Sequence, residues 1–241
     1  MSVTDLFSVE NRVVCISGAS RGLGKGLAAM FAERGARVVI ASWDDKELAA
    51  AKAELAAKGL QVEIVRADVS DPRACEELVV HTVNTFGRID TMICNAGIDR
   101  IKPAEDYEHD EWDRILDVNL KGAYFCSKYA GRAMLAAGKG SIIITSSIAG
   151  SSGIPGLAPY AASKGGIDQI VRTLGVEWAQ RGVRVNAVAP GYINMSWTAW
   201  TPHPPRPTSS EPWRAPRWDG AAKSPSSPAP TSFWQAMRRH T

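Results

Sequence analysis

The sequence predicts an α/β fold in which helices cover both faces of a doubly wound, parallel β-sheet. Short runs rich in β-branched residues alternate with longer amphipathic segments, as expected of parallel strands joined by crossover helices. The short runs are almost continuously apolar, which is typical of strands that are buried on both faces. Because such crossovers are right-handed, the expected arrangement is Rossmann-like.

Six strands are expected in chain order, in the runs "RVVCIS" (12–17), "ARVVIAS" (36–42), "QVEIVRAD" (61–68), "IDTMICNAG" (89–97), "GSIIITSS" (140–147) and "VRVNAVAP" (183–190). The helix that follows the first strand should begin near Leu23. A later helix should begin near Pro159, because proline suits the first turn of a helix.

The composition is that of a globular protein with one sizeable core. Of its 241 residues, 45% are apolar and 22% are charged. The longest apolar runs fall far short of the roughly 20 residues that span a bilayer, and the N-terminus has no signal-peptide pattern. A cytoplasmic protein without membrane contact is therefore expected. The cysteines lack metal-ligand spacing and are expected to be reduced and buried: Cys15, Cys75, Cys94 and Cys126.

Residues 196–241 do not follow the α/β pattern. They hold nine of the fourteen prolines and five of the eight tryptophans, but one of the twenty-one glycines. Proline-rich segments are usually linkers or disordered, whereas disordered segments are poor in tryptophan. The tail also carries six Lys or Arg against two acidic residues, so the rest of this +3 chain offers no basic stripe for nucleic acid. We expect a domain over 1–195 and an irregular tail over 196–241.

A glycine-rich turn follows the first strand. The stretch "SGASRGLGKG" places Gly18, Gly22 and Gly24 at the start of a helix. Glycines let the backbone turn tightly and approach a pyrophosphate, and a helix N-terminus supplies free N–H groups and the positive end of its dipole. The motif indicates a dinucleotide-binding loop, and a glycine turn without a ligand is the alternative.

Two further motifs carry groups that can move a proton. In "YAASK", Tyr160 and Lys164 are four residues apart and share one helix face. A phenol with a pKa of about 10 is a poor base at neutral pH, and a nearby ammonium group lowers that pKa. Ser147 ends a strand at the carboxyl edge of the sheet, where ligands bind in such folds. Singly these are common surface or turn residues, but together they indicate a reaction site.

The motif set over residues 7–195 resembles the short-chain dehydrogenase/reductase family. The motifs are the glycine loop, "NAG" at 95–97, "VNLKG" with Asn119, "SSIAG" thirteen residues before "YAASK", and "APG" at 189–191. The "SSIAG" spacing singles out Ser147 over Ser146. The subgroup most similar is that of gluconate 5-dehydrogenases and related sugar-acid or polyol dehydrogenases, and 3-oxoacyl carrier-protein reductase is the nearest competitor.

The resemblance implies a catalytic set. Tyr160 is the general acid/base, Ser147 hydrogen-bonds the substrate oxygen, Lys164 lowers the tyrosine pKa and holds the nicotinamide ribose, and Asn119 supports a water-linked proton path. No metal site is implied. The implied cofactor-binding residues are Gly18, Ser20, Arg21, Gly22, Leu23, Gly24, Ser42, Asp68, Val69, Asn95, Ala96, Gly97, Tyr160, Lys164, Pro190 and Gly191. For Asp68, which resembles the family's aspartate beside the adenine, a helix cap is the alternative, although Ser70 or Asp71 can fill that position.

The implied cofactor is NADP or NAD. A carboxylate at the end of the second strand would bind the ribose 2′-hydroxyl and select NAD, but Ser42 stands there, followed by Trp43. Arg21 is well placed to meet a 2′-phosphate, although Asp44 and Asp45 oppose it. These residues favour NADP.

The implied activity is hydride transfer between nicotinamide and a secondary alcohol or ketone, on a small-molecule substrate such as a sugar acid or polyol. In the family the segment after "PG" chooses the substrate, and here that segment lies in the atypical tail. A cofactor-binding protein with little or no catalysis is therefore the alternative. Family members also assemble as homo-oligomers through two long helices, expected here at 105–137 and 159–181, and through a last strand.

The tail is expected to be translated from a shifted reading frame. Read one base over, the codons of residues 232–240 can encode a segment like the family's "LASDASSY". The same shift makes 218–220 compatible with "LGRW" and 223–225 compatible with "EVA". The chain would then lack the family's last strand and its substrate-covering helices. A genuine Pro-rich appendage is the alternative, and an unbroken frame near the codons for 192–198 would establish it.

Overall fold

The computed structural model describes residues 7–191, and the six predicted strands are all present there. The strands are Val13–Ser17 (β1), Arg37–Ser42 (β2), Val62–Arg66 (β3), Thr91–Cys94 (β4), Gly140–Thr145 (β5) and Val183–Val188 (β6). All pair in parallel in one sheet of order β3-β2-β1-β4-β5-β6. The order reverses between β1 and β4, so a crevice is expected at their carboxyl ends. The predicted Rossmann-like sheet is confirmed.

Along the chain, helices alternate with the strands, as predicted. They are Gly22–Glu33 (α2), Asp45–Ala56 (α3), Pro72–Phe86 (α4), His109–Leu116 (α5), Gly122–Ala136 (α6) and Ala158–Trp178 (α7). A π-helical turn, Asp117–Lys121, joins α5 directly to α6. Single 3₁₀ turns occur at Ala104–Asp106, Ile148–Gly150 and Ala179–Arg181.

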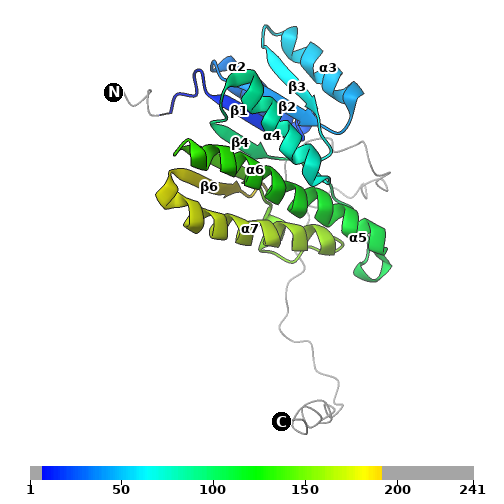
Figure 1. Ribbon diagram of the computed structural model, residues 1–241. Coiled ribbons are helices and arrows are strands. Elements are labelled where there is room, and N and C mark those ends of the chain that lie inside the picture. Colours follow the sequence, from blue (N-terminus) through cyan, green and yellow to red (C-terminus); the bar gives the residue numbers. More distant parts are fainter. Residues whose placement is uncertain (1–6, 192–241) are drawn as a thin grey trace, which may run out of the picture. The chain divides into compact units, whose positions relative to one another are not determined.

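The helices form two layers, one on each face of the sheet. In β1, Val14 and Ile16 pack in a cluster with residues of α2 and α3, whereas Cys15 packs in a second cluster with α4, α6 and α7. Figure 1 shows α4, α6 and α7 side by side across the front of the sheet. Successive strand residues point to opposite faces, so a strand covered on both sides must be apolar throughout.

Coverage of both faces holds for the central strands but not for β6. Every residue of β1 is buried, whereas β6 buries Val183 and Val185 and leaves its other four residues exposed. Within residues 7–191, β6 pairs with β5 alone and forms a sheet edge. The predicted absence of a last strand, the domain boundary at 195 and the shifted frame concern residues outside the described range.

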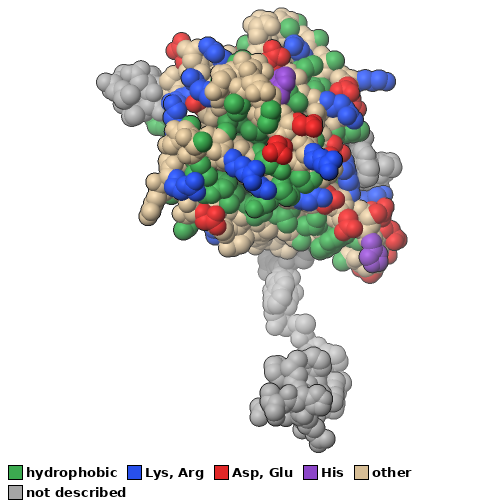
Figure 2. Space-filling model, in the orientation of Figure 1, with side chains coloured by type: hydrophobic (Ala, Val, Ile, Leu, Met, Phe, Trp, Pro, Cys, Tyr) green, Lys and Arg blue, Asp and Glu red, His purple; other side chains and the backbone are tan. Residues whose placement is uncertain are grey.

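The cysteines are free and buried, as predicted. Burial raises the pKa of Cys15 to about 12, so this thiol is unreactive at neutral pH. Acidic and basic side chains are intermixed on the face displayed in Figure 2. Among the helices of residues 7–191, none has the length and apolar character needed to cross a membrane.

Candidate active site

The turn from β1 into α2 lies directly against the segment that follows β4. Gly18 has a φ of +63°, and a Cβ there would stand 2.5 Å from the Ala96 Cα. A Cβ on Gly24 would stand 2.3 Å from the Gly18 carbonyl oxygen. The Asn95 side-chain amide donates to that same oxygen at 2.8 Å. Both glycines are therefore required for the close approach of helix, turn and strand.

The N-terminus of α2 fits a pyrophosphate. Arg21 occupies the N-cap, makes no side-chain capping hydrogen bond within residues 7–191, and is followed by a first turn free of acidic residues. The N–H groups of this turn are left for another partner, and the helix dipole favours an anion. Gly22 and Leu23 from this turn line the cleft.

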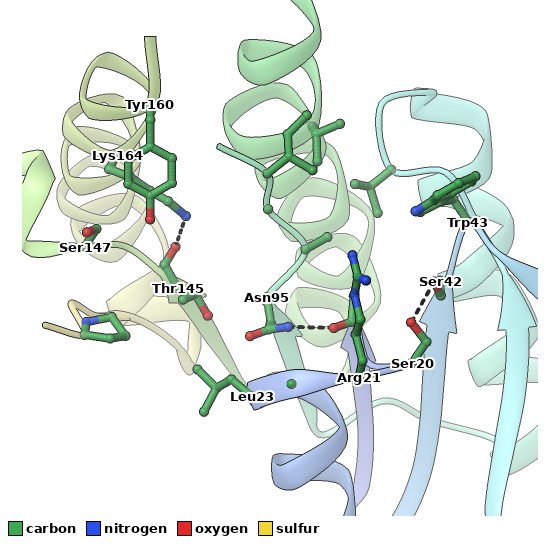
Figure 3. A pocket seen from close by; sticks show the side chains of 18 of the residues that line it. Ser20, Arg21, Leu23, Ser42, Trp43, Asn95, Thr145, Ser147, Tyr160 and Lys164 are labelled. Atoms are coloured by element: carbon green, nitrogen blue, oxygen red, sulfur yellow. Dashed lines mark hydrogen bonds between the residues drawn. The ribbon is translucent and has the colours of Figure 1, made fainter. Parts of the chain in front are cut away.

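One cleft runs along the carboxyl edge of the sheet and joins both predicted sites. Figure 3 shows Ser147, Tyr160 and Lys164 on one side of it, Ser42 and Trp43 on the other, and Leu23 and Asn95 between them. All of the expected cofactor-binding residues line it except Gly24. Gly24 is buried beneath the loop, where the absence of a side chain lets α2 pack closely against Gly18. Its contact with the cofactor stays a prediction.

The first turns of α7 place Tyr160 and Lys164 together. Lys164 is 3% exposed, and its Nζ lies 5.4 Å from the centroid of the Tyr160 ring. The same Nζ donates to the Thr145 carbonyl oxygen at 2.7 Å, at the end of β5. The Lys164 ammonium group is thus held close to the Tyr160 ring, at the carboxyl end of β5.

Burial dominates the pKa values of this pair. It raises the pKa of Tyr160, a hydrogen bond from Ser147 lowers it, and the Asp99 carboxylate raises it further. Lys164 is not among the groups that shift it. In the chain without bound dinucleotide, desolvation of the phenol outweighs the hydrogen bond from Ser147. The lowering of the Tyr160 pKa by Lys164 stays a prediction.

Burial also acts on the lysine itself. It lowers the pKa of Lys164 to about 8, against the opposing effects of Asp168 and Asp99. At pH 7 the lysine is mostly cationic, and at pH 9 it is mostly neutral.

The two serines after β5 have different surroundings. Ser146 Oγ donates to the Asp168 Oδ1 at 2.6 Å and is buried. Ser147 begins the Ile148–Gly150 turn, where its Oγ accepts from the Ala149 N–H at 3.2 Å and leaves the hydroxyl hydrogen for another acceptor. Both serines line the cleft, but it is Ser147 that hydrogen-bonds the Tyr160 side chain, whereas the Ser146 hydroxyl is bonded to Asp168.

Asn119 lies within the π-helical turn and is fully buried. Its side-chain amide donates to the Ile98 carbonyl at 2.9 Å and to Ser163 Oγ at 3.1 Å, and its oxygen accepts from the Ile98 N–H at 2.8 Å. Ser163 in turn donates to the Tyr160 carbonyl at 2.6 Å. Asn119 is not among the residues that line the cleft, and its side chain joins the loop after β4 to α7. Its support of a water-linked proton path stays a prediction.

The part of the cleft around Asp68 and Ser42 contains residues that the sequence analysis did not single out. Asp68 accepts from the Ser70 hydroxyl at 2.7 Å and pairs with Arg114 at 3.1 Å, while Asp71 caps α4. Burial alone would raise the pKa of Asp68, but the contacts with Ser70 and Arg114 outweigh it and keep the pKa below its ordinary value. Arg114 comes from α5, and no local motif signals it. Glu47, also unforeseen, lines the cleft beside Ser42.

A switch-point cleft with a phosphate loop at one end and a Ser-Tyr-Lys group at the other defines a dinucleotide-dependent oxidoreductase. The chain belongs to the short chain dehydrogenase family, whose model matches residues 12–203. The family consists of NAD(P)-dependent oxidoreductases, and the residues described above fit such a cofactor.

Relatives within the family act on different substrates. Gluconate 5-dehydrogenase of Gluconobacter oxydans is 33% identical over 198 residues, which cover 82% of this chain and 77% of the relative. The 3-oxoacyl-[acyl-carrier-protein] reductase FabG of Staphylococcus aureus is 38% identical over 184 residues, covering 76% and 75%. A crystal structure of NAD⁺-bound xylitol dehydrogenase has a TM-score of 0.73 and 32% identity, covering 76% of this chain and 71% of that one.

Proposed function

We propose that this chain transfers a hydride between a nicotinamide dinucleotide and the carbinol carbon of a secondary alcohol, with Tyr160 as the general acid/base. The observation that carries the proposal is the meeting of Ser147, Tyr160 and Lys164 at one end of the cleft that also contains the phosphate loop. The bound nicotinamide supplies or accepts the hydride.

The side chains handle the proton and the charge on the substrate oxygen. In reduction, the Tyr160 hydroxyl donates its proton to the carbonyl oxygen as the carbon gains the hydride; in oxidation, the tyrosinate takes the alcohol proton. Ser147 donates a hydrogen bond to the same oxygen. Because the pKa of Tyr160 is raised, the phenol is protonated at neutral pH and is ready to act as the acid. This state supports reduction at neutral pH.

The substrate that we propose is a sugar acid or a polyol. Similarity to gluconate 5-dehydrogenase and to xylitol dehydrogenase supports this class. A 3-oxoacyl thioester is the second candidate, supported by the 38% identity to FabG. Absorbance of the reduced nicotinamide, followed with a panel of polyols, keto-sugar acids and 3-oxoacyl thioesters, separates the two.

Replacing Tyr160 with Phe tests the proposed chemistry. The variant keeps the ring in place but removes the transferable proton, so turnover should fall by about 10²- to 10⁴-fold while dinucleotide binding changes little. Tyr124→Phe is the control, because that tyrosine is 39% exposed on α6 and lies outside the cleft.

Two results would count against the assignment. Equal turnover by the Tyr160→Phe variant and the unaltered chain would exclude Tyr160 as the acid/base. Tight dinucleotide binding without activity on any member of the substrate panel would support the cofactor-binding protein instead.

A homo-oligomer formed through α5–α6 and α7 is also proposed. Large apolar side chains are exposed on these helices: Trp112 (44%), Tyr124 (39%) and Val176 (81%). Figure 2 shows further hydrophobic side chains between the charged ones over α6. Exposed apolar groups of this kind favour association. Sedimentation analysis should show a dimer or tetramer that Val176→Asp weakens, and a monomeric chain would contradict it.

The free, buried thiols support the cytoplasmic location expected from the composition.

A further inference from the structure

A hydrogen-bonded cluster stands at the end of the cleft opposite Tyr160. Ser20 and Ser42 are buried, at 7% and 5% exposure, and their hydroxyl oxygens are 3.1 Å apart. The Ser20 hydroxyl donates to Glu47 Oε2 at 2.9 Å. The other carboxylate oxygen, Oε1, lies 3.3 Å from Arg21 Nη1. All four side chains line the cleft, and Figure 3 shows Ser20, Arg21 and Ser42 gathered there.

The first turn of α3 holds Glu47 in this position. Asp44 is the N-cap of α3, and its carboxylate accepts from the N–H groups of Lys46 and Glu47 at 2.9 Å each. The cap fixes the third residue of the helix, and the Glu47 side chain contacts Ser20 and Arg21 of the glycine loop. A negative charge is thereby linked to Ser42 through the Ser20 hydroxyl, although β2 itself ends in an uncharged residue.

The arginines of the cleft are already paired. Arg21 pairs with Glu47, and Arg114 pairs with Asp68 at 3.1 Å. A 2′-phosphate bound at this end of the cleft would meet an Arg21 guanidinium that already pairs with Glu47. It would also be repelled by the nearby Glu47 carboxylate. A 2′-hydroxyl, by contrast, can donate a hydrogen bond to that carboxylate.

We propose that Glu47 accepts a hydrogen bond from the adenosine ribose 2′-hydroxyl and thereby makes this chain bind NAD(H) in preference to NADP(H). The preference reverses the one that the sequence favours, because Arg21, the residue behind that expectation, is engaged by Glu47. The inference rests on the proposed dinucleotide-dependent function and adds the choice of cofactor to it. Glu47 is thus a specificity-determining residue located on α3 instead of at the end of β2.

Direct titration of NADH and NADPH tests this choice without any substrate. Trp43 lines the same end of the cleft and is 55% exposed, so its fluorescence reports binding there. The unaltered chain should bind NADH about tenfold more tightly than NADPH, which is the scale of one hydrogen bond to a charged group. In Glu47→Gln the NADH affinity should fall and the NADPH affinity should rise, so that the ratio drops by at least about tenfold.

Asp45→Asn is the matched control. Asp45 is the first residue of the same helix and carries the same charge, but its carboxylate pairs with Arg66 at 3.2 Å, is 69% exposed and lies outside the cleft. Removing this charge should leave the ratio of the two affinities within about twofold, because exposed charges act weakly at a distance.

A second variant keeps the test decisive if Glu47→Gln folds poorly. Arg21→Gln removes the cation and leaves Glu47 unpaired, so NADPH binding should weaken further while NADH binding is retained. Three results would each overturn the role of Glu47. The Arg21→Gln variant could bind NADPH more tightly, the unaltered chain could prefer NADPH, or Glu47→Gln and Asp45→Asn could have equal effects. Failure of both dinucleotides to bind the unaltered chain would instead overturn the proposed function.

Discussion

The two ends of the cleft differ in the groups that form them. We call the end at the glycine loop, residues 18–24, the phosphate end, and the end at Ser147, Tyr160 and Lys164 the reaction end. At the phosphate end, the backbone of the β1–α2 turn is pressed against the β4 loop, with a space at Gly18 that admits no Cβ. At the reaction end, titratable side chains are buried instead: Lys164 is 3% exposed and Tyr160 is partly buried. The phosphate end should therefore be sensitive to added atoms, and the reaction end to pH.

Gly18→Val gives the largest expected effect and tests the phosphate end. The added side chain meets the Ala96 backbone at 2.5 Å and also demands a φ of +63° from a β-branched residue. We expect a loss of at least about 3 kcal/mol in the free energy of unfolding, together with loss of NADH binding. Urea denaturation and dinucleotide fluorescence measure the two effects.

Gly26→Ala is the control for that substitution. Gly26 lies in α2, where the described residues leave open space for a Cβ, and alanine is the better helix former. The free energy of unfolding of the Gly26→Ala variant should stay unchanged or rise by up to about 1 kcal/mol. If Gly18→Val were as stable as the Gly26 variant and bound NADH normally, the steric account of the phosphate end would be wrong.

The parts of the site that depend on near neighbours in the chain could be predicted. The glycine loop follows its strand directly, and Tyr160 and Lys164 are one helical turn apart, so the motif and the period of the helix sufficed. The strands were found for the same reason, since each is a short apolar run.

The remaining features depend on residues that are distant in the sequence or on burial. Arg114 reaches Asp68 across 46 positions, and Glu47 meets Arg21 only because β2 and α3 fold back beside the glycine loop. The raised pKa of Tyr160 reflects desolvation, which no local pattern records.

The smaller effect concerns pH and tests the reaction end. The pKa of Lys164 is lowered from 10.5 to about 8 in the folded chain because burial disfavours the charged form. Between these two values the unfolded chain holds a proton that the folded chain has lost, so the free energy of unfolding must rise with pH in this window. Below pH 8 both states are protonated, and the full cost of the buried charge remains.

Lys164→Met removes this titration while keeping a side chain of similar length. The free energy of unfolding of the unaltered chain, minus that of the variant, should therefore increase by about 1–2 kcal/mol from about pH 7 to about pH 9.5. Urea denaturation at a series of pH values measures it. Lys139→Met, at an exposed lysine, is the control and should give a difference that stays flat over the same range. If the difference in the free energy of unfolding also stayed flat for Lys164→Met, burial of the ammonium group would not destabilise the fold. The contrast between the two ends of the cleft would then depend on the glycine turn alone.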